Sequence, residues 1–262
     1  DPDTTVKPLD ALGFGAHDGK RWEEMVTKPH GIILVTGPTG SGKTTTLYST
    51  LRRLATDEVN VCTIEDPIEM IQPSFNQTQV QSNIDLGFAE GLRALMRQDP
   101  DIIMVGEIRD LETAEMAIQA SLTGHLVLST IHTNDAATGI TRLVDMGVQP
   151  FLVASSLVAL QAQRLVRRVC PACARPYRPL ASGLSDVGID PERFFAGELA
   201  LKAPLIDAEG LPMPIEPPAG RVAPPPGMLF EANASGCERC GSTGYSGRTG
   251  IYEVLGNQHE VH

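Results

Sequence analysis

Aromatic residues and positive charge are both scarce in this chain of 262 residues. Phe, Trp and Tyr make up 5% of it, with a single Trp, and 21 Lys and Arg against 32 Asp and Glu give a formal net charge of -11. A chain with this balance has no overall attraction for nucleic acid phosphates or for an anionic membrane surface. It also offers few rings on which bases could stack. We therefore expect no nucleic acid partner.

A secretory signal and a long apolar run are also lacking. Residues 1–5 are acidic and polar, with no initiator Met, where a signal peptide needs positive charge followed by an apolar stretch. The longest uncharged stretches, 116–134 and 146–163, contain Gly, Gln and Ser and do not qualify as membrane spans. We expect a cytoplasmic chain that was cut from a longer protein.

The first half of the chain alternates short apolar runs with helical patterns. This alternation is typical of an α/β fold, in which helices flank a mostly parallel sheet. Strands are predicted at 31–36, 59–64, 102–105 and 126–131, and helices at 43–55, 89–98, 111–122 and 135–146. Residues 151–168, apolar early and basic late, are predicted to form one further helix, because basic residues suit the negative end of a helix dipole.

Proline dominates part of the second half. Eight of the 20 prolines fall within residues 204–226, a density that prevents regular packing. We predict a mobile, Pro-rich insertion at 181–230.

A phosphate-binding loop follows the first predicted strand. It consists of Gly37, Pro38, Thr39, Gly40, Ser41, Gly42, Lys43 and Thr44. This matches the pattern G-x-x-x-x-G-K-[ST] between a strand and a helix, so that backbone N–H groups and the helix N-terminus surround phosphate oxygens. Lys43 is predicted to reach the β and γ phosphates and Thr44 to bind Mg²⁺, and we include Thr45 in the nucleotide site.

Kinases, GTPases and motors share such a loop, so the acidic residues that follow must separate them. Residues 63–69 place Glu65, Asp66 and Glu69 at the carboxyl end of a strand, where ligands of open α/β sheets bind. Residues 99–110 form another strand that ends in Gly106 and Glu107, where many P-loop ATPases have Asp. We predict that Glu107 orients the attacking water. Asp110 precedes a helix and could equally be its cap.

Two histidines bracket the strand at 126–131. A lone His is more often a packing or capping residue, but His125 and His132 lie at the two ends of a strand that follows the phosphate loop. We predict that His132, with Asn134, senses the γ-phosphate.

These four segments occur in the order phosphate loop, 63–69, 99–110 and 123–135. In this order they resemble the secretion ATPases that power type II secretion and type IV pilus assembly, over roughly residues 8–255. The resemblance implies a RecA-like P-loop ATPase domain that works as a homo-hexamer. It also implies inner-membrane platform proteins as partners, with the ATPase bound peripherally at that membrane.

The resemblance further implies roles for individual residues. It assigns ATP and Mg²⁺ to Lys43 and Thr44, an acidic box to Glu65, catalysis to Glu107, and a His box to His125 and His132. We count Glu65, His125 and His132 with Glu107 as candidate catalytic residues. In the family, arginines of the nucleotide site come from a preceding N-terminal domain. We interpret 1–30 as a remnant of the linker to that domain with the start of the motor domain, and 31–168 as the ATPase domain. The fragment alone is expected to be weakly active.

Four cysteines form two C-x-x-C pairs, and their spacing predicts a structural Zn²⁺ site. They are Cys170, Cys173, Cys237 and Cys240. A disulfide is the alternative, disfavoured in a cytosolic chain. The 63 residues between the pairs exceed the spacing of about 15 to 20 in a compact zinc ribbon, but loop closure costs little extra for longer loops. Cys62 is interpreted as a buried small residue.

The cysteines also bear on the subfamily. Retraction ATPases of type IV pili generally lack the four cysteines, whereas secretion and pilus-extension members carry them. We therefore predict a zinc module at 169–245 and a truncated continuation at 246–262. The favoured function is the type II secretion ATPase, with pilus extension as the alternative. A nucleic-acid translocase on the same core and a non-hydrolysing nucleotide-binding scaffold are further alternatives.

Overall fold

The computed structural model describes residues 6–186, 188–196, 205–206, 212–213 and 228–256. Much of the insertion predicted at 181–230, including seven of its eight clustered prolines, lies outside these residues. By compactness the chain divides into one unit of residues 1–165 and 250–262 and a second unit of residues 166–249. The division into domains at 1–30, 31–168, 169–245 and 246–262 stays a prediction.

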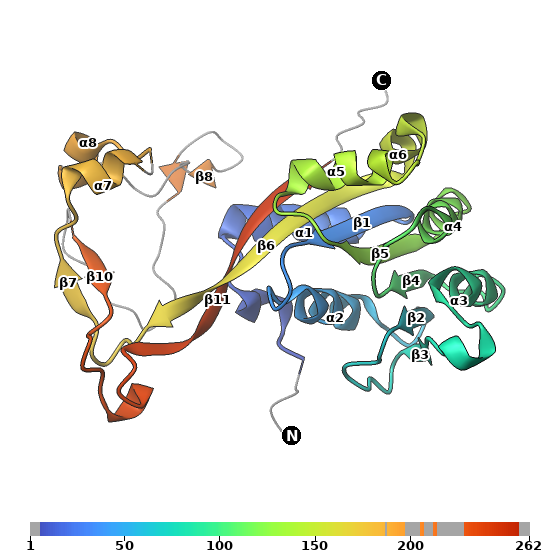
Figure 1. The fold of residues 1–262 in the computed structure, drawn as a ribbon, viewed down its shortest axis with the longest axis horizontal. Helices are drawn as coiled ribbons and strands as arrows, with labels where there is room; N and C mark the ends of the chain where they lie inside the picture. Colours follow the sequence, from blue (N-terminus) through green and yellow to red (C-terminus); the bar gives the residue numbers. More distant parts are fainter. Residues whose placement is uncertain (1–5, 187, 197–204, 207–211, 214–227, 257–262) are drawn as a thin grey trace. The chain divides into compact units, whose positions relative to one another are not determined.

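A seven-stranded sheet forms the centre of the first unit (Figure 1). In sheet order it contains β11 (Tyr245–Gly256), β6 (Leu157–Val169), β1 (Gly31–Thr36), β5 (Leu126–Ile131), β4 (Ile102–Val105), β2 (Val61–Glu65) and β3 (Asn76–Gln79). The pairs from β6 to β3 are all parallel. Every residue of β1, β2, β4 and β5 is buried, which explains their almost continuous apolar sequences.

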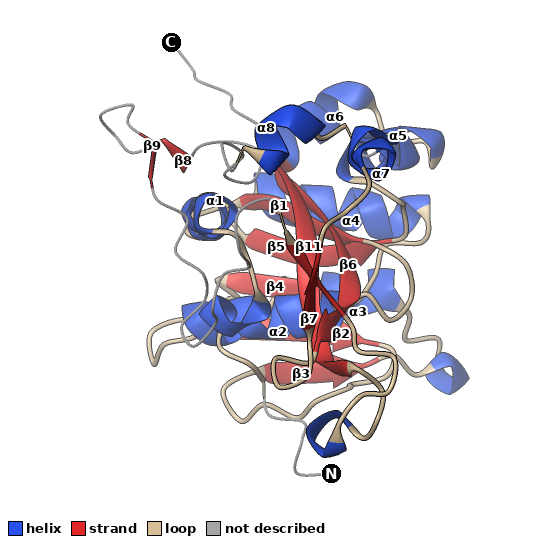
Figure 2. Ribbon diagram, turned by 90° about the vertical axis from the view of Figure 1, so that its left-hand side faces the viewer, coloured by secondary structure: helices blue, strands red, loops and turns tan. Residues whose placement is uncertain are grey.

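Helices cover both faces of this sheet (Figure 2). They are α1 (Ala16–Val26), α2 (Lys43–Leu54), α3 (Phe88–Leu95), α4 (Leu111–Leu122), α5 (Ala136–Asp145) and α6 (Pro150–Ser156), with short 3-10 helices at Leu9–Leu12 and Ser82–Ile84. Helices α1 and α2 contribute to one apolar cluster, and α3 to α6 contribute to the other. The predicted α/β fold with a mostly parallel sheet is confirmed.

Two helices begin at aspartate caps. Asp110 accepts a hydrogen bond from the N–H of Thr113 at 2.8 Å, and Asp135 accepts one from Thr138 at 2.8 Å. Such caps satisfy N–H groups that lack a partner inside the helix. Asp110 is therefore a helix cap, the alternative left open by the sequence, and the helix that it caps has the predicted bounds 111–122.

The single helix predicted for residues 151–168 is wrong. Helix α6 ends at Ser156, and β6 follows with 13 residues, of which 157–162 lie beside β1, with Thr36 opposite Ala162. The short apolar run at 157–160 fits a buried strand as well as a helix, so periodicity alone does not separate the two. The free edge of β1 decides the conformation, because pairing with it satisfies the backbone of β6.

An aromatic cluster fixes the N-terminal segment to the last strand. Phe14 stacks on Tyr252 with ring centroids 4.0 Å apart and on Trp22 at 6.1 Å. The Tyr252 hydroxyl donates to the carbonyl of Leu12 at 3.0 Å, and Trp22 donates to Thr50 at 3.1 Å. Residues 9–26 therefore pack against Tyr252 within the first unit.

The second unit is smaller and has short elements. They are β7 (Arg175–Tyr177), α7 (Ala181–Asp186), α8 (Pro191–Phe195), β8 (Leu205–Ile206), β9 (Pro212–Met213), β10 (Leu229–Glu231) and a 3-10 helix at Glu238–Cys240. Strands β7 and β10 pair antiparallel. Within the described part of the chain, no helix is long and apolar enough to cross a bilayer.

Candidate nucleotide site and cysteine cluster

The phosphate loop leaves β1 and enters α2 through three glycines with positive φ. Gly37, Gly40 and Gly42 have φ values of 145°, 76° and 87°, a region that L side chains rarely adopt. Lys43 folds back over the loop, and its Nζ donates to the carbonyls of Gly37 at 2.8 Å and Pro38 at 3.1 Å. The loop therefore has the conformation that its sequence pattern predicts.

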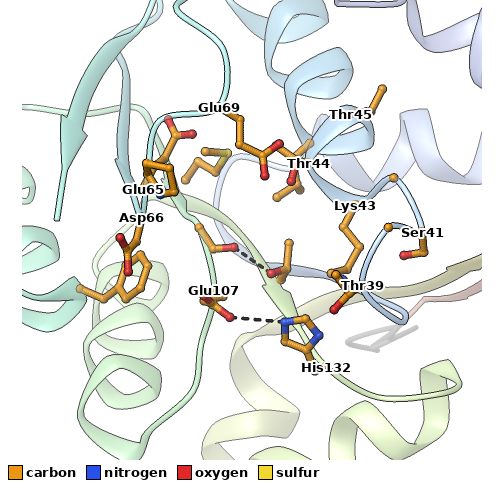
Figure 3. Close-up of a pocket in the computed structure, with 18 of the residues that line it drawn as sticks. Thr39, Ser41, Lys43, Thr44, Thr45, Glu65, Asp66, Glu69, Glu107 and His132 are labelled. Carbon is orange, nitrogen blue, oxygen red and sulfur yellow. Dashed lines mark hydrogen bonds and ion pairs between the residues drawn. The ribbon is translucent and has the colours of Figure 1, made fainter.

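A cavity of about 430 Å³ opens in front of this loop, within the range of about 300 to 1,000 Å³ typical of small-molecule sites. Residues 39–45 line it on one side, and the carboxyl ends of β2, β4 and β5 supply Glu65, Glu107 and His132 on the other (Figure 3). Gly37 and Pro38, at the start of the loop, do not line the cavity. Residues that the sequence singled out after separate strands thus line one cavity.

Glu107 lies at the end of β4 with its side chain 13% exposed. One carboxylate oxygen lies 2.5 Å from Nη2 of Arg109, and the other lies 3.3 Å from Nε2 of His132. The backbone before it is fixed as well, because the Thr130 hydroxyl donates to the carbonyl of Gly106 at 2.8 Å. Two side chains thus contact the Glu107 carboxylate, and one of them, Arg109, was not singled out by the sequence and does not itself line the cavity.

Two carboxylates lie close enough to Lys43 to affect its pKa. Burial lowers the pKa of Lys43, while the carboxylates of Glu107 and Glu69 act in the opposite direction. Glu69 points toward Thr44 in Figure 3. Oxygen ligands of this kind suit a divalent cation such as Mg²⁺. The side of the cavity between Thr44 and Glu69 therefore fits the cation that accompanies a bound nucleotide.

Glu65 is buried, at 3% exposed, and its carboxylate is already bonded within the protein. It accepts hydrogen bonds from Tyr48 at 2.5 Å, Thr63 at 2.6 Å and Gln77 at 3.2 Å. Burial and the bond to Glu65 raise the pKa of Tyr48 above its ordinary value. Glu65 thus lies at the cavity wall, but its oxygens are committed to neighbouring side chains.

The two predicted histidines are not brought together. His132 faces Glu107, whereas His125 lies at the opposite end of β5, outside the cavity. Nδ1 of His125 lies 2.9 Å from the carbonyl of Ala120 and 3.3 Å from the hydroxyl of Thr123, at the end of α4. A strand advances about 3.3 Å per residue, so seven residues separate them by roughly 20 Å. The structure therefore places His125 at a helix end and not at the nucleotide cavity.

Hydrogen bonds to Thr36 and Glu253 connect the residues that follow His132 to the rest of the first unit. The Thr36 hydroxyl, one residue before the phosphate loop, accepts from the N–H of Thr133 at 2.8 Å. Glu253 on β11 accepts from the N–H of Ala136 at 3.0 Å, at the start of α5. No sequence pattern indicates these partners, because they are distant along the chain.

The four cysteines gather in the second unit, with all four sulfur atoms within 4.8 Å of one another. Sγ of Cys170 lies 3.9 Å from that of Cys237, and Cys240 lies 3.9 Å from Cys173 and 3.8 Å from Cys237. Tetrahedral zinc with bonds of about 2.3 Å requires sulfurs about 3.8 Å apart, whereas a disulfide requires about 2.05 Å. All five cysteines are free.

Backbone donors reinforce this geometry. The N–H groups of Cys237 and Gly244 donate to Sγ of Cys240 at 3.1 and 3.2 Å. Such bonds stabilise thiolates. The donor set therefore fits a Cys₄ zinc site, and Cys62 is separately buried in the core, as expected.

Comparisons with known proteins identify the family of this chain. Residues 1–262 match the family described as type II/IV secretion system protein. The chain belongs to this family. The resemblance inferred from the four ordered segments is confirmed.

Three curated relatives illustrate the range of the family. The type IV pilus assembly ATPase TfpB of Acinetobacter baylyi is 54% identical over 97% of the chain. The type II secretion system protein E of Pseudomonas aeruginosa is 51% identical over 94%, and the type II secretion system ATPase E of Vibrio cholerae is 48% identical over 97%. The chain spans 38%, 42% and 44% of these relatives, respectively.

Solved structures confirm the RecA-like ATPase fold. The pilus retraction motor PilT, solved with bound ADP, is 38% identical with a TM-score of 0.56, covering 63% of this chain and 50% of that one. The Legionella pneumophila ATPase DotB is 33% identical with a TM-score of 0.54, covering 62% and 47%.

Proposed function

We propose that this chain is the motor part of an ATPase that powers pseudopilus assembly in type II secretion and so drives protein export across the outer membrane. One observation carries the proposal. The phosphate loop and Glu107 face each other across a single cavity, as ATP hydrolysis requires. The type II secretion relatives from Pseudomonas aeruginosa and Vibrio cholerae support it.

Side chains in and beside the cavity, together with the loop backbone, have roles in the proposed reaction. Backbone N–H groups of the loop bind the phosphates, and Lys43 neutralises their charge. Thr44 and Glu69 would hold Mg²⁺, which when bound supplies positive charge to the phosphate oxygens. Glu107 orients the attacking water and accepts its proton, while Arg109 and His132 hold the Glu107 carboxylate.

The proposed assembly is a homo-hexamer bound peripherally at the cytoplasmic side of the inner membrane, with platform proteins as partners. Arginines from a preceding domain would complete the charge around the γ-phosphate. The four cysteines would hold a structural Zn²⁺ in the second unit, supported by their spacing and their free thiols.

Pilus extension is the second candidate. The 54% identity to the type IV pilus assembly ATPase of Acinetobacter baylyi favours it. Chimeras distinguish the two functions. Residues 1–262 would replace the matching segment in the Vibrio cholerae and Acinetobacter baylyi relatives, with secretion and piliation as readouts. Rescue of secretion alone supports the first proposal, and rescue of piliation alone supports the second.

ATP binding and turnover by the full-length protein test the shared activity. Lys43→Ala should weaken nucleotide binding at least tenfold and remove turnover, because no other side chain of the phosphate loop carries positive charge. Binding without turnover by the wild type would favour a non-hydrolysing scaffold. Turnover that DNA stimulates in a salt-dependent way would favour a nucleic-acid translocase.

A further inference from the structure

Strand β6 lies directly against the back of the phosphate loop. A Cβ added at Gly37 would lie 2.3 Å from the backbone oxygen of Gln163, and one at Gly42 would lie 3.3 Å from Nε2 of the same residue. A distance of 2.3 Å is far inside van der Waals contact. Position 37 therefore needs glycine for two reasons: a side chain there would collide with the backbone of β6, and its φ is positive.

The side chain of Gln163 is buried, at 3% exposed, and both ends of its amide are bonded. Nε2 donates to the carbonyl of Ser41 in the loop at 2.8 Å. Oε1 accepts from the hydroxyl of Thr46 in α2 at 2.8 Å and from Nε2 of Gln161 at 2.8 Å. One side chain thus links the loop, the first turn of the following helix and β6.

The two attachment points lie on either side of the phosphate-binding residues. Ser41 precedes Gly42, Lys43 and Thr44 in the chain, and Thr46 follows them. Fixing the Ser41 carbonyl toward β6 turns the next peptide N–H groups toward the cavity, because successive groups of the loop are covalently coupled. A buried amide between two fixed points also limits the motion of the segment that it spans.

We propose that Gln163 is the positioning residue of the phosphate loop: it holds the loop N–H groups in the arrangement that binds the β-phosphate before the nucleotide arrives. The inference rests on the proposed ATPase function and adds to it a residue outside the loop pattern. A loop that is ordered in advance binds its ligand more tightly, since less conformational entropy is lost on binding.

Gln161 offers a matched control on the same strand. It is fully buried and donates to Gln163, but no bond from it to the phosphate loop is among those of the described residues. A substitution at Gln161 therefore removes a buried amide of the same size from β6 and leaves the bond from Gln163 to Ser41 in place.

The test compares Gln163→Met and Gln161→Met in the full-length protein. Gln163→Met keeps an unbranched side chain of similar length and removes the three bonds. We expect its Kd for ATP and ADP, and its KM for ATP, to rise about tenfold, equivalent to about 1.4 kcal/mol, with kcat changed less than threefold. Gln161→Met should keep Kd within about threefold, although both variants lower the Tm.

A second pair of variants keeps the test decisive if Gln163→Met does not fold. Gln163→Glu retains size and both acceptor bonds but replaces the donor to Ser41, and Gln161→Ala removes the neighbouring buried amide without placing an acceptor against Oε1 of Gln163. Only Gln163→Glu should weaken nucleotide binding tenfold or more. A folded Gln163 variant that binds ATP and ADP within twofold of the wild type would overturn the proposal.

The wild type separates failure of this inference from failure of the proposed function. If the wild type neither binds nor hydrolyses ATP, the proposed function fails, and the inference fails with it. If the wild type binds and hydrolyses ATP but the variants at 163 and 161 behave alike, only the positioning role of Gln163 is overturned.

Discussion

Nε2 of His132 lies 3.3 Å from Oε2 of Glu107, and this contact joins the ends of two neighbouring strands at the phosphate-loop cavity. Glu107 follows β4 and His132 follows β5, and the two strands are parallel, with Val105 opposite Ser129. Parallel strands place their carboxyl ends at one edge of a sheet. A carboxylate and an imidazole 25 positions apart in sequence therefore share one site.

His132→Ala should lower kcat about tenfold while ATP binding stays within about threefold of the wild type. Among the residues that the structure describes, the imidazole contacts Glu107 and forms no hydrogen bond with the phosphate loop, so its loss frees the carboxylate to leave its position. Steady-state turnover and nucleotide titration measure the two effects separately. His125→Ala is the matched control, because His125 lies outside the cavity; an equal loss of kcat there would contradict this assignment.

Tyr48→Phe should destabilise the fold by about 1–3 kcal/mol, because it leaves the buried Glu65 carboxylate without its shortest hydrogen bond. Urea unfolding of the chain measures the change. Tyr177→Phe in the second unit removes the same hydroxyl from a partly exposed ring and should cost far less. Equal losses of unfolding free energy in the two variants would show that the hydrogen bond to Glu65 does not stabilise the fold.

Tyr252 should make stability fall at alkaline pH. Burial raises its pKa to about 12, above the value of about 10 expected in the unfolded chain. Its contribution is therefore fully present below pH 10 and is lost as the pH rises toward 12. Between pH 10 and 12, Tyr252→Phe should make the unfolding free energy fall less steeply with pH, by at most about 1.4 kcal/mol per pH unit. An unchanged slope would contradict the assignment.

Metal analysis should find one zinc per chain, and Cys170→Ser should remove it. Cys170 is buried among the other three sulfurs, so three ligands would remain at an incomplete site. Protein-bound zinc after gel filtration is the readout. Cys62→Ala removes a cysteine from the core and should leave the zinc content unchanged. Wild-type protein with far less than one equivalent would refute the zinc proposal.

The sequence predicts best those features that depend on neighbouring residues. The phosphate loop, the helix at 111–122 with its Asp110 cap and the buried strand before the loop all follow from local patterns. The meeting of Glu107 with the loop also follows, because parallel strands present their carboxyl ends together.

Features that depend on distant partners could not be predicted in this way. Residues 157–169 form a strand because β1 has an edge to pair with, which no local pattern reveals. Gln163 has its place at the phosphate loop for the same reason, as does Glu253 at the start of α5. His125 lies at the opposite end of β5 from His132 and does not line the cavity, so its predicted place in the His box stays a prediction.

The most direct test of the proposed mechanism is single-turnover ATP hydrolysis by the full-length Glu107→Gln protein, with nucleotide affinity measured in parallel. Gln keeps the size of the side chain but cannot accept a proton from the attacking water. The mechanism predicts a rate at least 100-fold lower than that of the wild type, with ATP affinity within about threefold. A rate close to that of the wild type would contradict the role of Glu107 and, with it, the proposed mechanism.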